Sequence, residues 1–249
     1  MSIQDKWRAV IAEGHTIRSV EEGIYSVLSD GPHIHLYDGR AAIYDLVVGT
    51  RLYNRVVWGA FLLDYVRFAR QAVASHPAGM LLDAGCGSLL FTAQAYLDCE
   101  RPILAFDQSL QMLRRARSRL RKLAGCVPEH IILLQADLSA LPFRPASFHT
   151  ALCMNVLHHL ADAGGVLTGL KRLLVNGGHL YLTSLVKGNR LIGDQYLHTL
   201  YRWGDFVHPR TGVELGNLLA GSFGQSVSYW VQGNMAYATA ATSIQRRAA

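Results

Sequence analysis

The sequence predicts an α/β fold in which a mostly parallel sheet lies between two layers of helices, with a C-terminal antiparallel hairpin and a helical N-terminal cap. From Gly79 onward, short apolar runs alternate with helix-length amphipathic segments, as in strand–helix–strand units. Two alternating segments, 225–231 and 235–239, then follow and are joined by Gln232-Gly233-Asn234, which is typical of a hairpin. Before residue 78 the sequence lacks strand-like alternation and has helical character.

Five apolar runs are the expected strands of the parallel part, and the two hairpin strands make the sheet seven-stranded. The five runs are 80–84, 103–106, 131–135, 150–154 and 178–185. Helices are expected near 89–97, 109–123 and 164–174, the last ended by Asn176-Gly177-Gly178. Parallel strands that alternate with helices indicate a Rossmann-like three-layer sandwich.

The N-terminal part is expected to be a separate helical layer. Ser19-Val20-Glu21-Glu22 has the pattern of a capping box and predicts a helix toward Leu28. A second helical stretch, rich in aromatic residues, is expected from about 39 to 73. We therefore predict a cap or substrate lid at 1–77 and a main domain at 78–249, with a lid insertion at about 187–223.

Composition narrows the class of protein. Half of the 249 residues are hydrophobic and 17% are charged, which is typical of a globular chain. No apolar run reaches the roughly 18 to 20 residues that span a bilayer, so we expect a cytoplasmic protein without a membrane span. The cysteines form no Cys-x-x-Cys pair and no histidine cluster has zinc spacing, so we expect reduced thiols and no metal.

A net charge of +6 raises the question of an anionic partner. Six of the 24 basic residues lie between Arg114 and Lys122, where Leu113, Ala116 and Leu120 repeat at helical spacing. We interpret these cations as the solvated outer face of one amphipathic helix. Contact with nucleic acid is the alternative, and we disfavour it.

A glycine-containing turn follows the first predicted strand. Asp83 closes that strand, and Ala84-Gly85-Cys86-Gly87-Ser88 leads into a helix. Ligands bind at this edge in open α/β sheets, because glycines let them approach the main chain and the next helix offers free N–H groups. The third glycine of the dinucleotide fingerprint is missing, since Leu90 stands there, and simple helix–strand packing remains an alternative.

Two more carboxylates close neighbouring strands. Asp107 follows Ile103-Leu104-Ala105-Phe106 and lies 22 residues after Gly85 (107 − 85 = 22), where a carboxylate can accept hydrogen bonds from both ribose hydroxyls. Asp137 follows the strand at 131–135 and can accept a hydrogen bond from the adenine amino group. Three acidic strand ends in succession favour a nucleoside-binding site.

These segments resemble the class I S-adenosylmethionine-dependent methyltransferases, and among them the type 11 group, which includes the ubiquinone and menaquinone methyltransferases. The matching segments are Leu82-Asp83-Ala84-Gly85-Cys86-Gly87, Phe106-Asp107-Gln108-Ser109, Ala136-Asp137-Leu138, Leu141-Pro142-Phe143, Asn155-Val156-Leu157-His158-His159-Leu160 and Gly177-Gly178. The resemblance covers about residues 79–186.

The resemblance implies roles position by position for S-adenosylmethionine. Asp83, Gly85, Cys86 and Gly87 would surround its methionine part, and Asp107 would hold its ribose. Gln108, Asp137 and Leu138 would lie at the adenine, with Met154 and Asn155 near the reactive methyl. Two positions depart from the family pattern: Leu89, which is expected to narrow the loop by one side chain, and His149, where the family usually has an acid.

Methyl transfer depends mainly on holding two reactants together, and a general base is needed only if the acceptor loses a proton. His158 and His208 are the candidate bases, with His159 also considered. For the His158-His159 pair, bracing of the strand-to-helix turn is the favoured alternative.

The acceptor is expected to be a small molecule, planar or apolar, because the flanking segments are rich in aromatic residues. The candidate substrate residues are Tyr44, Tyr53, Tyr196, Tyr201 and Trp203. Arg190, Arg202 and Arg210 would instead favour an acidic acceptor. The alternative is that these aromatic and basic residues only pack the lid and do not contact a substrate.

Other functions stay open. An NAD(P)-dependent oxidoreductase would share the glycine loop and Asp107, although the sequence has no Tyr-x-x-x-Lys pair. Two further alternatives are an RNA methyltransferase that uses the basic surface and a paralogue that binds the cofactor without catalysing a reaction.

Overall fold

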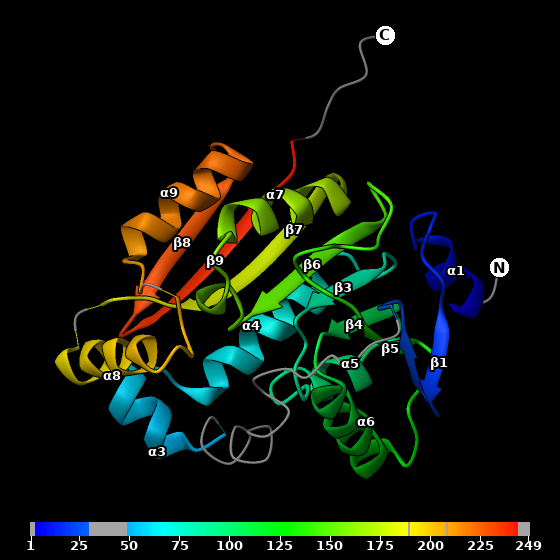
Figure 1. The fold of residues 1–249 in the computed structure, drawn as a ribbon, viewed down its shortest axis with the longest axis horizontal. Coiled ribbons are helices and arrows are strands. Elements are labelled where there is room, and N and C mark those ends of the chain that lie inside the picture. The colour runs from blue at the N-terminus through cyan, green and yellow to red at the C-terminus, as the bar shows by residue number, and fades with distance from the viewer. Residues whose placement is uncertain (1–2, 30–48, 189, 208, 244–249) are drawn as a thin grey trace, which may run out of the picture.

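The computed structural model describes residues 3–29, 49–188, 190–207 and 209–243 and consists of one sheet with helices on both faces (Figure 1). In these residues nine strands form the sheet in the order β1-β2-β5-β4-β3-β6-β7-β9-β8. The strands β2, β5, β4, β3, β6 and β7 are parallel to one another, whereas β9 is antiparallel to both β7 and β8. The predicted Rossmann-like α/β class is confirmed.

The elements have the following bounds in chain order. They are α1 (Ile3–Ala9), β1 (Arg18–Glu21), β2 (Ile24–Ser26), α3 (Arg51–Tyr53), the π-helix η1 (Asn54–Trp58), α4 (Leu62–Ala74), β3 (Leu81–Ala84), α5 (Ala93–Leu97), β4 (Ile103–Asp107), α6 (Leu110–Ala124), β5 (Ile131–Gln135), β6 (Phe148–Met154), the 3-10 helix η2 (Leu157–His159), α7 (Ala163–Leu173), β7 (Leu174–Leu185), α8 (Leu191–Arg202), α9 (Gly212–Phe223), β8 (Val227–Gln232) and β9 (Met235–Ala241).

The strands expected after Gly79 are all present, with bounds shifted by a few residues. The helix cap predicted at Asn176-Gly177-Gly178 is wrong, because α7 ends at Leu173 and β7 begins directly at Leu174. Gly177, with φ 75°, lies inside β7 instead, where the register with β6 shifts between Phe148 and Thr150.

The helix predicted at Ser19 is also wrong, because residues 18–26 form the hairpin β1–β2. Gly23, with φ 76°, makes its turn, and β2 then adds to the sheet edge beside β5. Ile24 and Ser26 are buried there. Glu21, which lies inside the predicted capping box, pairs with Arg114 and Arg117 of α6. Sheet pairing and burial therefore override the local capping pattern, and they bring the strand number from the expected seven to nine.

The second N-terminal stretch is helical but interrupted. The short α3 continues into η1, and Gly59 (φ 66°) ends the π-helix before α4 begins at Leu62. The part of this prediction at 39–48, which includes Tyr44, lies outside the described residues.

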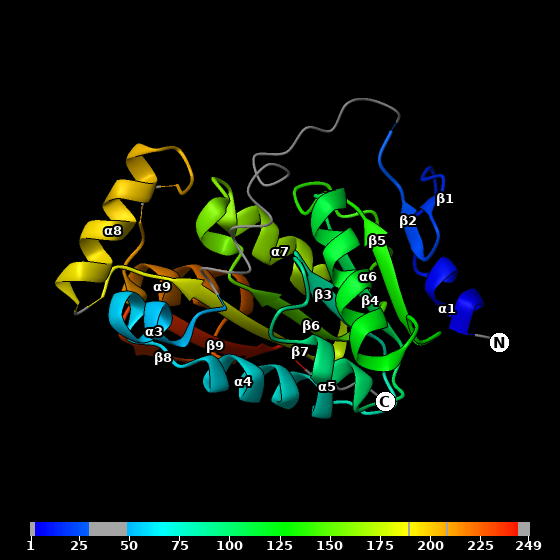
Figure 2. The same cartoon turned by 90° about the horizontal axis from the view of Figure 1, so that it is seen from below.

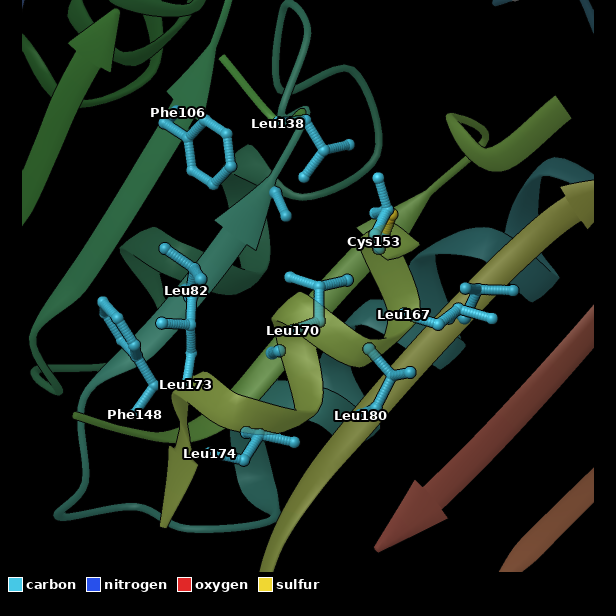
Figure 3. Close-up of a cluster of buried hydrophobic side chains, with 14 of the residues drawn as sticks. Leu82, Phe106, Leu138, Phe148, Cys153, Leu167, Leu170, Leu173, Leu174 and Leu180 are labelled. Atoms are coloured by element: carbon cyan, nitrogen blue, oxygen red, sulfur yellow. The ribbon is translucent and has the colours of Figure 1, made fainter. Parts of the chain in front are cut away.

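Two apolar clusters hold the helical layers to the sheet. One joins α1, α7 and α9 to one face, and Figure 3 shows its centre, where Leu167 and Leu170 of α7 pack over Leu82, Cys153 and Leu180 of the sheet. The other joins α4, α5 and α6 to the opposite face. Figure 2 shows these layers on either side of the sheet, with α8 and α3 together beyond one end of it. Among the described helices, none is long and apolar enough to cross a membrane.

Candidate functional site

The glycine loop after β3 packs tightly against neighbouring residues at Gly85, whereas no atom lies close to the loop at Gly87. The N–H groups of Gly85 and Cys86 both donate to the carbonyl oxygen of Phe106, at 2.9 and 2.8 Å. A Cβ atom on Gly85 would lie 2.6 Å from a methyl group of Val156, so only glycine fits there, and its φ of 75° favours glycine as well. Gly87 has φ 53° and no atom within 4 Å of the position a Cβ would take.

Asp107, at the end of β4, connects this loop to the start of α6. Its Oδ2 accepts the N–H of Gly87 and its Oδ1 accepts the N–H of Ser109, each at 2.8 Å. Ser109 in turn caps α6, because its hydroxyl accepts the N–H of Met112. The carboxylate is therefore fixed in one orientation by two backbone donors, and such donors stabilise its charged form.

Asp83 is 2% exposed and is the most deeply buried acid of the site. The hydroxyl of Tyr96 donates to its Oδ2 at 2.7 Å. Burial, and to a smaller extent the nearby charge of Asp107, raise the pKa of Asp83 to about 7, against the opposing effect of the Tyr96 hydrogen bond. A buried carboxyl group of this kind gains most from a cationic ligand.

The third carboxylate, Asp137, follows β5, which is the next strand along the sheet. Its Oδ1 accepts the N–H of Ser139 at 2.8 Å. Because β5, β4 and β3 are adjacent and parallel, the three acids meet at the carboxyl edge of the sheet. Burial raises the pKa of the Cys86 thiol well above its usual value, so this side chain adds no charge.

These residues surround a cavity of about 210 Å³. The structure brings every predicted cofactor-binding residue into its wall: Asp83, Gly85, Cys86, Gly87, Asp107, Gln108, Asp137, Leu138, Met154 and Asn155. Asn155 has φ 57°, and its side-chain oxygen accepts the hydroxyl of Thr183 at 3.0 Å. Within the described residues no group of three or more His, Cys, Asp or Glu side chains could hold a metal ion.

Sequence reasoning missed several wall residues, among them Phe91, Met112, Val156 and Leu160. The apolar ones carry no signal that separates a cavity wall from a core. His159 was considered beside His158, but its sequence neighbourhood alone does not show which of two consecutive rings faces the cavity.

His158 is not part of the cavity wall. Its side chain is buried within η2, where its Nδ1 accepts the N–H of Leu185 at 3.2 Å and its ring centroid lies 4.5 Å from that of Phe206. Burial lowers its pKa well below the usual value. The other candidate base, His208, lies outside the described residues.

Leu89 does not narrow the cavity, so that expectation is wrong. Its side chain is fully buried in the cluster formed with α4, α5 and α6, and it is absent from the cavity wall. The backbone there has φ 56°, a conformation that residues other than glycine rarely adopt. His149 lies at the amino end of β6, beside His76, whereas the cavity is at the carboxyl edge.

Tyr53, Tyr196, Tyr201 and Trp203, the substrate candidates that the structure describes, lie outside the cavity wall. Tyr53 and Tyr196 meet around Trp58, with ring centroids 6.0 and 5.6 Å from it, where η1 packs on α8. This cluster reaches the cavity through Phe91 and Met154, which belong to both. Trp203 is 66% exposed after the end of α8.

Comparison with known proteins assigns the central part of the chain. Residues 82–182 match the sequence model of a family described as a methyltransferase domain. The ubiquinone biosynthesis O-methyltransferase of Xanthomonas campestris pv. campestris (strain B100) is 31% identical over 159 residues, which are 59% of this chain and 62% of that protein. That of Xanthomonas axonopodis pv. citri is 27% identical, over 59% and 64% of the two chains. The chain thus covers less than two thirds of these relatives.

Solved structures share the fold at low identity. The geranyl diphosphate methyltransferase complexed with GPP and sinefungin has a TM-score of 0.57 at 13% identity, over 73% of this chain and 78% of that one. Phosphoethanolamine N-methyltransferase 2 of Haemonchus contortus has a TM-score of 0.65 at 13% identity, over 84% and 58%. The [4+2]-cyclase SpnF has a TM-score of 0.64 at 17% identity, over 84% and 94%.

Proposed function

Residues 82–182 belong to the methyltransferase domain family, and from this premise we propose that the chain transfers a methyl group from S-adenosylmethionine to a small, planar or apolar acceptor. The observation that carries the proposal is the meeting of Asp83, Asp107 and Asp137 with the glycine loop around one cavity. The three carboxylates can accept hydrogen bonds from, or pair with the charge of, a cationic nucleoside, and the backbone at Gly87 leaves room for the ligand.

The wall chemistry fits S-adenosylmethionine. Asp83 is a buried carboxyl group that a positive charge on the methionine part would satisfy. Asp107 lines the cavity and is oriented by two backbone N–H donors, and a carboxylate is an acceptor that suits ribose hydroxyls. Asp137 and Leu138 would hold the adenine.

When bound, this cofactor supplies a methyl group on a positively charged sulfur that leaves readily. The chain's own part is then to bind, to orient the acceptor and to exclude water. Phe91 supports a planar or apolar acceptor, because it lines the cavity and stacks on Tyr65 of α4 with ring centroids 4.7 Å apart. We assign the acceptor side to the segments around η1 and α8, which pack on each other through Trp58 and Tyr196.

The basic surface gives no support to an RNA substrate. Arg114 and Arg117 of α6 both pair with Glu21, and Arg121 pairs with Glu22 at 2.9 Å. Arg119 donates to the carbonyl oxygen of Ser88. Four of the six cations of the predicted face therefore have protein partners.

Since the fold is shared with a cyclase, methyl transfer needs its own test. Calorimetry should detect binding of S-adenosylmethionine and S-adenosylhomocysteine, with NADH as the negative control. Mass spectrometry should then detect transfer of a deuterated methyl group to a small molecule that co-purifies with the chain. Heat with NADH and with neither nucleoside would contradict the proposal.

A further inference from the structure

Large hydrophobic side chains are exposed together at one end of the molecule. Of the 14 that are exposed among the described residues, eight lie in two short segments, 51–63 and 191–203. Single exposed hydrophobic side chains are normal on a protein surface, whereas a concentration of them marks a contact site. Six of them are called the end surface from here on: Leu52, Val56, Phe61, Leu63, Leu191 and Ile192.

The two segments that form the end surface are neighbours in space. Figure 1 and Figure 2 both show α3 and α8 side by side, beyond one end of the sheet. Arg190, directly before α8, donates from its guanidinium to the carbonyl oxygen of Val56 at 2.8 Å. This contact brings the exposed start of α8 against η1, so the end surface is one region of the molecule.

Packing of the core does not account for these side chains, because the same segments already bury another side. Trp58 of η1 and Leu197 of α8 are buried in the cluster that joins them to α4 and the sheet. In the same segments Leu52 is 69% exposed and Leu191 is 80% exposed. Helices that are apolar on the outer side as well as the inner side indicate a second apolar partner.

Uncompensated positive charge accompanies the end surface. Arg51 and Arg55 are exposed and lie four residues apart in the sequence. In the part of the chain that the structure describes, no carboxylate pairs with either of them, and residues 51–63 contain no Asp or Glu. Arg55 lies instead over the exposed Phe61 ring, 6.0 Å from its centroid. Like charges at this spacing repel each other, so a negatively charged partner would relieve the repulsion.

We propose that the end surface docks the chain on an anionic lipid membrane. Its hydrophobic side chains enter the boundary between headgroups and acyl chains, while Arg51 and Arg55 lie at the headgroup phosphates. Docking of this kind needs no helix that spans the bilayer. The inference goes beyond the proposed function and does not depend on it.

Two other partners fit the end surface less well. A second copy of the chain, related by a two-fold axis, would bring Arg51 and Arg55 against the same arginines with no carboxylate between them. A nucleic acid would pair with the arginines but would offer no apolar layer to Leu191 and Ile192. A lipid surface supplies the negative charge and the apolar layer together.

Flotation with lipid vesicles tests the docking on the full chain. We expect the chain to float with vesicles of equal parts phosphatidylglycerol and phosphatidylcholine and to stay unbound with phosphatidylcholine alone. Binding should fall as NaCl is raised, because salt screens the charge of the headgroups. Equal binding to both kinds of vesicle, or binding to neither, would overturn the proposal.

A hydrophobic pair of variants locates the contact. Leu191→Ser combined with Ile192→Ser should weaken binding to the anionic vesicles by about tenfold, because two side chains lose their apolar surroundings. The matched control is Leu123→Ser, which is 51% exposed on α6, away from the end surface in both views. We expect the control to bind like the wild type. A double variant that binds as tightly as the control would remove the end surface from the contact.

A charge pair separates the end surface from the basic face of α6. Arg51→Gln combined with Arg55→Gln should weaken binding by about 30-fold, as expected for two cations near an anionic membrane. Arg115→Gln combined with Lys122→Gln removes the same charge from α6 and should stay within about twofold of the wild type, because charge interactions fall off within about 10 Å in salt. The opposite order of the two effects would assign the membrane to α6 and contradict the proposal.

A fluorescent probe and the mass of the lipid-free chain complete the test. Leu52→Trp should be quenched by brominated phospholipid in the anionic vesicles, and Leu123→Trp should not. Light scattering should give the wild type and the variant with Leu191→Ser and Ile192→Ser the same mass. A wild-type dimer that this variant converts to a monomer would show that a second copy covers the end surface, and the lipid assignment would then be wrong.

Discussion

Replacing Asp83 by Asn is expected to change the pH dependence of stability of the ligand-free chain. The pKa of Asp83 is about 7 in the folded chain, against an ordinary value of 3.8. Between these two pH values the native state keeps a proton that the unfolded chain has lost. The free energy of unfolding therefore falls as pH rises through this window, by about 1.4 kcal/mol per unit.

The window spans about three pH units, so the loss reaches about 4 kcal/mol at pH 8 as an upper value. Asp83→Asn removes it, because the amide stays neutral and its oxygen can still accept the Tyr96 hydroxyl. We expect the variant to resemble the wild type near pH 4 and to be the more stable protein at pH 8.

Urea unfolding at a series of pH values measures this difference directly. The matched control is Asp98→Asn, a half-exposed carboxylate that pairs with Arg70 at the surface. We expect the control to keep the slope of the wild type between pH 4 and 7. If Asp83→Asn kept that slope as well, or were less stable than the wild type at pH 8, the assignment of a protonated, buried Asp83 would be refuted.

The other predictions concern binding and backbone strain. Asp107→Ala should weaken S-adenosylhomocysteine by about 1.5–3 kcal/mol in calorimetry, the typical value of hydrogen bonds to a charged group, and an unchanged Kd would reject the ribose role. Leu89→Ala should cost about 2–5 kcal/mol of unfolding free energy. Leu89→Gly should be no less stable than Leu89→Ala. Glycine relieves about 1–2 kcal/mol of left-handed backbone strain, which offsets the loss of one further buried methyl group, and thermal unfolding of the two variants measures the difference. Glu21→Gln should increase salt-sensitive retention on RNA relative to wild type, since it releases Arg114 and Arg117, and equal retention would show that these pairs do not mask the surface.

The cofactor side of the site was predictable because its signals are local. Asp83, Asp107 and Asp137 each close an apolar run, and strands that alternate with helices are parallel. Parallel neighbours bring their carboxyl ends to one edge, so position in sequence was enough to place the three acids together. The same reasoning placed Gly85 and Gly87, because a turn between strand and helix needs positive φ.

Other features depend on contacts between distant segments. Ser19 to Glu22 has a capping pattern, but Ile24 gains more by burial at the edge of the sheet, and Glu21 gains two arginines of a helix about 95 residues away. Leu89 was expected to narrow the loop because the family usually has a glycine or another small residue there, whereas its side chain is buried in the core and its backbone has φ 56°.

The acceptor side of the site also depends on contacts between distant segments, so similarity in the matched segment does not determine it. The methyltransferase domain match ends at residue 182, before the segment 205–210 that orients His159. His159 lines the cavity and His158 does not, and Asp205 and Phe206 contact the His159 ring. A relative could therefore keep the three acids and the glycine loop, bind the same cofactor and act on a different acceptor. The acceptor must therefore be inferred from the part of this chain that lies outside residues 82–182.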